Sequence, residues 1–256
     1  MSNTPSKIWI IDPVARCVEF IAEEAKIGGL LQRALTHVEM GRPLLELAAL
    51  RFLEAGHTQA LENLKLLLAS APLQEEWARE LRATGYAPLN SHGLVAIWGA
   101  LEVCIEDTVV SILSHDSASL AKIEAGGVKV NRDASGYVAE EEFRRVYRRL
   151  ESQRTVEDNI VDTYEALLGL FGLSAAAKLH SATLIEVNAL RNCIMHRGGI
   201  IDQKAANQAP SLQPYVGKKY LVTNADFIKY HEAISAWVVA LMGSVCASSY
   251  AKAASS

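Results

Sequence analysis

Apolar residues recur every three or four positions between Thr183 and His196, and two glycines follow, which constrains this segment to an amphipathic helix with a defined end. An α-helix advances about 100° per residue, so this spacing gathers the apolar members on one face. They are Leu184, Val187, Leu190 and Ile194. Glycine readily adopts the left-handed conformation that ends many helices. We therefore predict a helix that buries one face and places His196 in its last turn.

The same periodicity elsewhere predicts an all-α fold. One helix is expected from about Gly93 to Leu113, with an apolar stripe along its length, and others from about Ala139 to Arg154 and from Val156 to Phe171. A capping-box pattern, Thr223-Asn224-Ala225-Asp226, predicts the start of a final helix. The resulting architecture is a helical bundle with an additional N-terminal helical region.

The N-terminal region, 1–90, is predicted as a separate helical extension, and its role stays open. Glycines and prolines punctuate residues 13–86, which predicts several short helices there. Residues 87–91 look like a linker, and Ser91 is a suitable cap for the helix that follows. The main helical domain is therefore expected to span 91–256. Within it, residues 115–136 contain paired glycines and turn-forming residues, and an irregular insertion is expected.

Charge and cysteine usage limit the classes of function. The chain carries 25 Lys and Arg against 29 Asp and Glu, a net charge of −4, so any contact with RNA must be local. Four widely spaced cysteines form no zinc-ligand pattern, which predicts no metal, and no motif calls for a cofactor. They are Cys17, Cys104, Cys193 and Cys246. Isolated cysteines, together with a first segment that lacks a signal-peptide core, favour a cytoplasmic protein.

An uncharged stretch from Ala233 to Ala251 is long enough on paper to cross a bilayer. Serines and glycine dilute its hydropathy, and the same helix pattern includes Asp226, Lys229 and Glu232 just before it. We therefore expect a core helix, and no association with a membrane.

The helix expected at about 139–154 is strongly charged. The helix carries five arginines and four glutamates in all, which are Arg144, Arg145, Arg148, Arg149, Arg154, Glu140, Glu141, Glu142 and Glu151. Glu141 lies four residues before Arg145. This spacing favours a solvated helix face held by ion pairs. The alternative is a local basic patch that binds phosphates.

The polar side of the helix that ends at His196 carries the candidate chemistry. Asn188, Asn192 and His196 are spaced four apart and share one stripe, with Arg191 between that stripe and the apolar face. Metal-independent cleavage of RNA needs proton transfer and positive charge on the phosphate, which His and Arg can supply. However, Arg191 and His196 differ by about 140° around the helix. A symmetric dimer that joins two such helix ends would bring both residue types together.

The pattern Arg191-Asn192, three further residues and His196 resembles the signature of the HEPN family, an arginine followed after four to six residues by histidine. The continuation 197–202, with its paired glycines, and the helix from Trp98 to Asp107 are also similar to that family. The resemblance covers roughly residues 91–251. It implies a HEPN-type bundle that dimerises and a composite site without metal or cofactor.

The resemblance implies an endoribonuclease of a toxin-antitoxin, abortive-infection or other antiphage system. RNA would be the substrate, and a second copy and an antitoxin or another defence protein would be the partners. His196 would act as general acid and base, Arg191 would stabilise the phosphate, and Asn192 would position the substrate or the histidine.

Other interpretations remain open from the sequence. His196 could simply bond helix carbonyls, Arg191 could pair with Glu186 or Glu102, and Cys193 is expected to be a packing residue. A second function, from another class, is a non-catalytic dimerisation or scaffold module of a larger defence complex. Nucleotide turnover is disfavoured because the chain has neither a Walker loop nor a GxGxxG motif.

Overall fold

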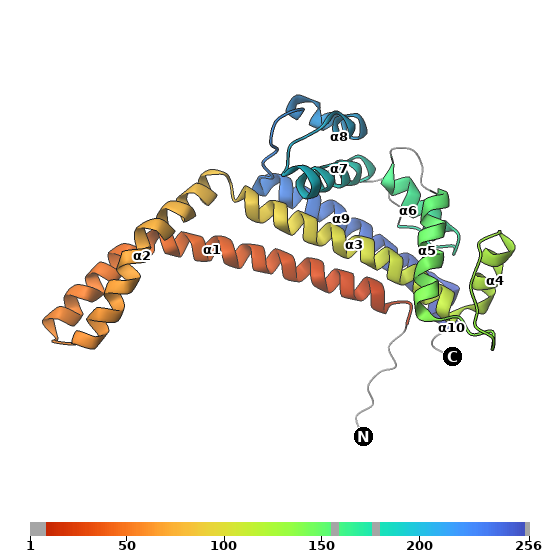
Figure 1. Ribbon diagram of the computed structural model, residues 1–256, viewed down its shortest axis with the longest axis horizontal. Helices are drawn as coiled ribbons and strands as arrows, with labels where there is room; N and C mark the ends of the chain where they lie inside the picture. Colours follow the sequence, from red (N-terminus) through yellow and green to blue (C-terminus); the bar gives the residue numbers. More distant parts are fainter. Residues whose placement is uncertain (1–8, 155–158, 176–179, 254–256) are drawn as a thin grey trace, which may run out of the picture. The chain divides into compact units, whose positions relative to one another are not determined.

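The computed structural model describes residues 9–154, 159–175 and 180–253, and most of them are helical (Figure 1). No β-strand occurs among them, and only two isolated bridges join Ile200 to Lys219 and Ile201 to Val216. The helices are α1 Asp12–Glu54, α2 Thr58–Ala83, α3 Ala87–His115, α4 Ser117–Ala125, α5 Glu140–Arg154, α6 Ile160–Gly169, α7 Ser181–Arg197, α8 Gln203–Gln208, the 3-10 helix η2 Pro210–Tyr215, α9 Asn224–Ala247 and α10 Ser249–Ala253. The predicted all-α fold is confirmed.

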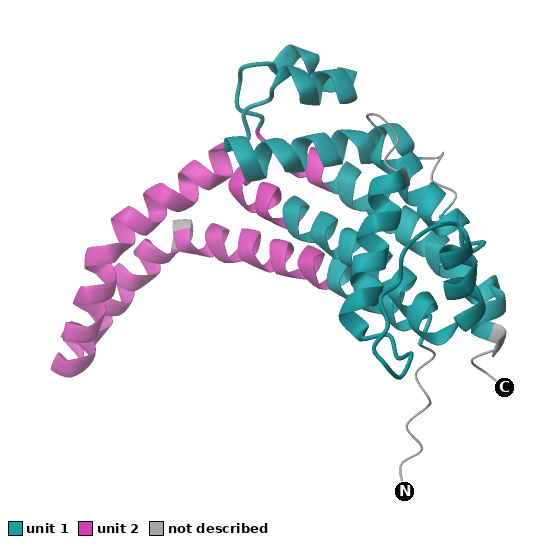
Figure 2. Cartoon of the chain, turned by 45° about the vertical axis from the view of Figure 1, so that its right-hand side comes forward, with its two compact units in different colours: residues 1–22, 94–220, 228–256 teal, residues 23–93, 221–227 magenta. Residues whose placement is uncertain are grey.

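The chain divides into two compact units, whose described residues are coloured separately in Figure 2. Unit 1 comprises residues 1–22, 94–220 and 228–256, and unit 2 comprises residues 23–93 and 221–227. One boundary between the two units falls inside α3, between Gly93 and Leu94.

In unit 2, the expectation of several short helices between Pro13 and Tyr86 is wrong. Two long helices occupy this region, and Pro43 and Pro72 lie inside them. Leu, Ala and Glu favour the helix strongly enough to carry it past single prolines and glycines. The break between α1 and α2 comes instead at Gly56, which has a φ of +72°.

The expected linker at 87–91 is also helical, because α3 begins at Ala87. Asn90 in its first turn is only 4% exposed. Its side-chain NH2 group lies 3.0 Å from the carbonyl oxygens of Gly85 and Val222 and 2.9 Å from Oδ1 of Asn224, so its two hydrogens are shared among three acceptors. A buried amide with three acceptors holds this segment firmly, so it does not act as a linker.

In unit 1, the buried faces follow the sequence pattern. The predicted stripe of α3 is buried at Leu94, Ile97, Trp98, Leu101, Ile105, Thr108 and Ile112. On α7, Leu184, Val187 and Leu190 are buried, while Ile194 is half-buried. The helix α6 contacts both α5 and α7, and α8 contacts α7 and η2. These contacts place α8 beside the end of the helix that carries the candidate residues.

Two further expectations need adjustment. Residues 117–125 form the helix α4, so only the later part of the expected irregular insertion lacks regular structure. The reason is a cap that the sequence analysis missed, since Asp116 accepts hydrogen bonds from the N–H groups of Ala118 and Ser119. The helix expected from Val156 is present as α6, but Val156 itself lies outside the described residues.

The final helix begins as predicted. The Thr223 N–H donates to Asp226 over 3.0 Å, and the Asp226 N–H donates to the Thr223 hydroxyl over 3.2 Å, so the capping box is formed. By length and mean hydropathy, α9 alone among the described helices could cross a membrane. One of its faces packs inside the protein, and 39% of its most apolar 18-residue window is buried. A core helix of a folded body passes the same test, so α9 is weak evidence for a membrane.

Candidate functional site

The end of α7 is fixed by the paired glycines. Gly198 adopts a left-handed conformation with a φ of +60°, and the Gly199 N–H donates to the Cys193 carbonyl over 3.0 Å. This arrangement satisfies a carbonyl that the last turn would otherwise leave unpaired. His196 therefore lies in the last turn, as predicted.

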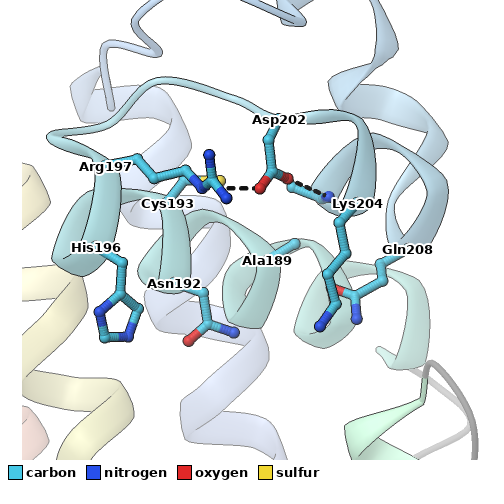
Figure 3. A pocket seen from close by; sticks show the side chains of 9 residues that line it. Ala189, Asn192, Cys193, His196, Arg197, Asp202, Lys204 and Gln208 are labelled. Atoms are coloured by element: carbon cyan, nitrogen blue, oxygen red, sulfur yellow. Dashed lines mark hydrogen bonds and ion pairs between the residues drawn. The ribbon is translucent and has the colours of Figure 1, made fainter.

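A pocket of about 290 Å³ lies beside this turn, between α7 and the region of α8. It is lined by Ala189, Asn192, Cys193, His196, Arg197, Asp202, Lys204, Ala205 and Gln208. Figure 3 shows the side chains of His196, Asn192, Lys204 and Gln208 extending toward the same side of the pocket. The structure thus brings together two of the three predicted site residues with two polar residues from α8.

Among the described residues that line the pocket, Asp202 is the one carboxylate, and it already has partners. It accepts a hydrogen bond from the Ala205 N–H over 2.7 Å and pairs with Nε of Arg197 over 2.9 Å. Lys204, in contrast, forms no ion pair with any residue that the structure describes. The uncompensated positive charge of the pocket is therefore that of Lys204, which suits an anionic group.

Arg191 lies against α3. It donates to the Glu102 carboxylate over 2.6 Å and to Oδ1 of Asn192 over 3.0 Å. Glu102 is itself held by the indole N–H of Trp98, over 3.0 Å. The ion pair with Glu102, one of the two considered from the sequence, is therefore present. The other does not form, because Glu186 accepts from Tyr230 over 2.6 Å and Lys229 over 3.0 Å.

Asn192 links these two environments. Its Oδ1 accepts from Arg191, which leaves its amide nitrogen as the donor that can serve the pocket. Arg191 does not line the pocket, whereas His196 does. This agrees with the angle of about 140° between them on a regular helix. One copy of α7 thus presents the histidine and the arginine in different directions.

Lys204 and Gln208 were not predicted, because the sequence indicates no helix between the glycine stop at 198–199 and the capping box at 223–226. Asp202 could have indicated a helix start in the sequence, because aspartate is a common N-cap residue. In the structure its side chain accepts a hydrogen bond from the Ala205 N–H. That signal predicts the short helix α8, but not that it would face α7.

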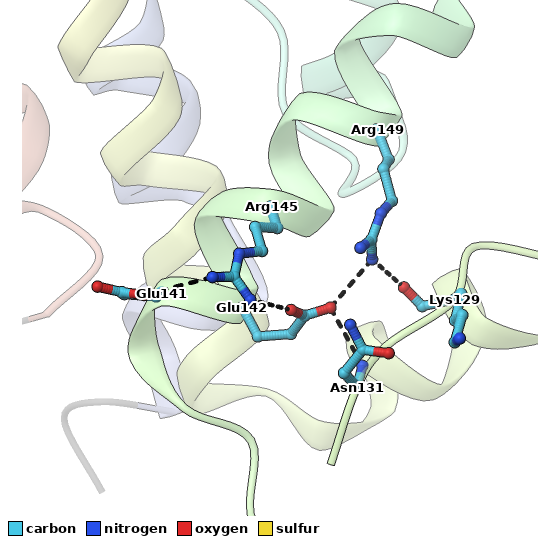
Figure 4. Close-up of polar contacts among 6 residues, drawn as sticks. All are labelled: Lys129, Asn131, Glu141, Glu142, Arg145 and Arg149. Carbon is cyan, nitrogen blue, oxygen red and sulfur yellow. Dashed lines mark hydrogen bonds and ion pairs between the residues drawn. The ribbon is translucent and has the colours of Figure 1, made fainter.

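Arginines of the charged helix α5 form ion pairs with glutamates and an aspartate, as the first of the two interpretations from the sequence predicts. Figure 4 shows Arg145 and Arg149 converging on the buried carboxylate of Glu142, with Arg149 also reaching the Lys129 carbonyl. Arg144 pairs with Glu106 over 2.9 Å and with Asp107 over 3.0 Å. These three arginines are therefore neutralised, which disfavours a phosphate-binding patch on this helix.

Glu142 is only 3% exposed. Its burial alone would raise its pKa, but hydrogen bonds from the Asn131 N–H and from Arg149 outweigh burial, so the pKa lies below its usual value. Glu142 remains ionised and acts as the anchor of the ion pairs.

Cys193 is buried, and burial raises the pKa of its thiol, which agrees with a packing role. Among the described residues, no three His, Cys, Asp or Glu side chains gather in a way that could hold a metal ion. No family model, curated protein or solved structure matches this chain.

Proposed function

We propose that this chain is a cytoplasmic, metal-independent endoribonuclease of the HEPN kind that acts as a homodimer. The observation that supports it most is the pocket at the end of α7, where His196 and Asn192 lie beside Lys204, which pairs with no carboxylate in the part of the chain that the structure describes. A proton-transferring group, an amide donor and a free cation are the groups that cleavage of a phosphodiester requires.

In the proposed reaction, the 2′-hydroxyl of the RNA attacks the adjacent phosphorus while the bond to the 5′-oxygen breaks. His196 accepts the proton of the hydroxyl as general base, and the imidazolium so formed donates a proton to the leaving 5′-oxygen as general acid. Arg191 stabilises the extra negative charge on the phosphate, and Lys204 binds a neighbouring phosphate. The products carry a 2′,3′-cyclic phosphate and a 5′-hydroxyl, so a 2′-deoxy substitution at the cut site abolishes cleavage.

The requirement for two copies follows from the directions of the side chains. Arg191 is held against Glu102, while His196 lines the pocket on another side of α7. An isologous dimer with its two α7 ends at the two-fold axis can place the arginine of one copy beside the histidine of the other. In a toxin-antitoxin or antiphage setting, an antitoxin or another defence protein would control access to this composite site.

The test compares total RNA from cells that express the wild-type chain, His196→Ala or Arg191→Ala, with each purified protein sized for dimers. His180→Ala is the matched control, because His180 lies at the other end of the same helix and makes no capping bond through its side chain. The wild type and the control should cut RNA, and both site variants should be inert. Uncut RNA with a folded, dimeric wild type and its native partner would reject the nuclease.

Complementation tests the composite site directly. Each inactive variant retains what the other lacks, so re-associated mixtures of His196→Ala and Arg191→Ala should regain activity. Half of the dimers would be mixed and each would hold one complete site, which predicts about a quarter of the wild-type rate. A mixture as inert as its components would show that no site is shared between copies.

A second candidate function is that of a binding module, and exposed apolar side chains in unit 2 favour it. They are Ile27, Leu30, Leu31, Leu44, Leu47, Leu50, Leu53, Leu66, Leu67, Leu73 and Trp77. Exposed apolar surface of this extent commonly marks a protein interface. Loss of partner binding in Leu66→Glu and Leu73→Glu, with RNA left intact by every variant, would favour a scaffold over a nuclease.

A further inference from the structure

Two of the four cysteines meet in unit 1, although 87 positions separate them in the sequence. Cys17 on α1 is 4% exposed and Cys104 on α3 is 2% exposed. Both line a pocket of about 340 Å³, and no other cysteine or methionine is found among its described lining residues. Its remaining lining residues are Pro13, Arg16, Phe20, Gly99, Ala100, Val103 and Asp107. The two thiols are therefore buried in packing, yet they border a space that a small molecule can enter.

The two thiols interact directly and unequally. A hydrogen bond from Cys104 lowers the pKa of Cys17 and outweighs its burial. The same contact and burial raise the pKa of Cys104. A thiol that ionises more readily is the better nucleophile, and a neighbouring protonated thiol can then resolve the product. The pair thus has the asymmetry of an attacking and a resolving cysteine.

We propose that Cys17 and Cys104 form a redox-active dithiol site that a small hydroperoxide, such as hydrogen peroxide, oxidises to a disulfide joining α1 to α3. The Cys17 thiolate attacks one peroxide oxygen, the O–O bond breaks, and the released hydroxide takes up a proton to form water. Cys17 is then a sulfenic acid. The Cys104 sulfur attacks the Cys17 sulfur, the S–O bond breaks, and the departing hydroxide takes the Cys104 proton. Two thiols and one peroxide thus give one disulfide and two waters.

The other two cysteines lack this arrangement. Cys193 is buried at the end of α7 beside Asp202, and Cys246 is exposed on α9. Neither lines the pocket that holds Cys17 and Cys104. They therefore provide matched controls within the same chain, one for a buried cysteine without a thiol partner and one for an exposed cysteine.

The experiment treats the reduced protein with one equivalent of hydrogen peroxide, then blocks free thiols in denaturant before mass spectrometry. The wild type, Cys193→Ser and Cys246→Ser should each lose the mass of two hydrogens and yield a peptide that links Cys17 to Cys104. Reduction with dithiothreitol should restore both thiols. Because a disulfide that closes a long loop restricts the unfolded chain, the oxidised protein should melt several degrees higher.

Substitution of one cysteine at a time distinguishes the attacking cysteine, Cys17, from the resolving cysteine, Cys104. Cys104→Ser should stop at a Cys17 sulfenic acid, trapped by dimedone, whereas Cys17→Ser should form neither the adduct nor the disulfide. Circular dichroism of each variant shows whether the fold is retained, and the wild-type peptide map does not depend on either variant folding. Four blocked thiols after peroxide, or a crosslink only through Cys246, would overturn the proposal.

Discussion

The Arg191 guanidinium is bound to the Glu102 carboxylate over 2.6 Å, so a residue of α3 sets the direction of the candidate arginine on α7. Glu102 is in turn oriented by Trp98, whose side chain is almost fully buried. The ion pair is partly shielded from solvent, with 25% of the arginine side chain and 34% of the glutamate side chain exposed. A buried indole thus fixes a carboxylate, and the carboxylate fixes the cation.

Glu102→Gln should reduce RNA cleavage while the protein stays folded. The amide keeps the size of the side chain but loses the charge that holds Arg191, and a displaced catalytic group costs on the order of ten- to a hundredfold in rate. Initial rates on a short oligoribonucleotide measure the effect. Glu106→Gln is the control, because Glu106 lies one turn along α3 and pairs with Arg144. Equal rates for both variants would mean that the direction of Arg191 is unimportant.

Glu142→Gln should destabilise the protein at neutral pH by about 2 kcal/mol, since a buried carboxylate with charged donors is replaced by a neutral amide. The folded-state pKa of Glu142 is lowered, so its carboxylate stabilises the fold above its usual value of 4.5. This contribution is lost as the pH falls through the folded-state pKa. The difference in the free energy of unfolding between wild type and variant should therefore shrink below about pH 4.

Urea denaturation at a series of pH values tests this expectation. Glu141→Gln is the matched control on the same helix, because its side chain is 86% exposed and lies 3.5 Å from Arg145. An exposed pair of this kind contributes about 0.5 kcal/mol or less. A Glu142→Gln effect as small as the control, or one that grows in acid, would contradict the assignment of Glu142 as the anchor of α5.

Gly198→Ala should lower the free energy of unfolding by about 1 kcal/mol, because a side chain strains the left-handed backbone that ends α7. No atom lies within 4 Å of the added carbon, so the loss comes from the backbone alone. Gly198→Asn should lose less, since asparagine tolerates this conformation. Thermal melts compare both with Gly169→Ala, which has an ordinary φ, open space around it and no expected loss. Equal losses at both glycines would refute the strain.

The helical fold could be predicted where one helix carries its own signals. The stripe of α3, the glycine stop of α7 and the capping box of α9 all depend on residues that are neighbours in the sequence. The long helices α1 and α2 were not predicted, because the glycines and prolines between residues 13 and 86 were expected to end helices. In the structure, the strong helix formers on each side of Pro43 and Pro72 stabilise the helix by more than the loss of one backbone hydrogen bond at each proline destabilises it.

The candidate site was predictable only in part. His196, Asn192 and Arg191 follow from spacing on one helix, and so does the angle that separates arginine from histidine. The contribution of Lys204, the choice of Glu102 over Glu186 and the meeting of Cys17 with Cys104 depend on which elements pack together. Periodicity within one helix carries no information about that choice.

The amide of Asn90 has a consequence for the time at which this protein can mature during synthesis. Its acceptor on Val222 lies 132 residues further along the chain. At about 5–20 residues per second, a ribosome needs roughly 7 to 26 seconds to synthesise that interval. During this time the Asn90 amide has no Val222 carbonyl to bind. The first turn of α3 therefore reaches its final state only after Val222 has been synthesised.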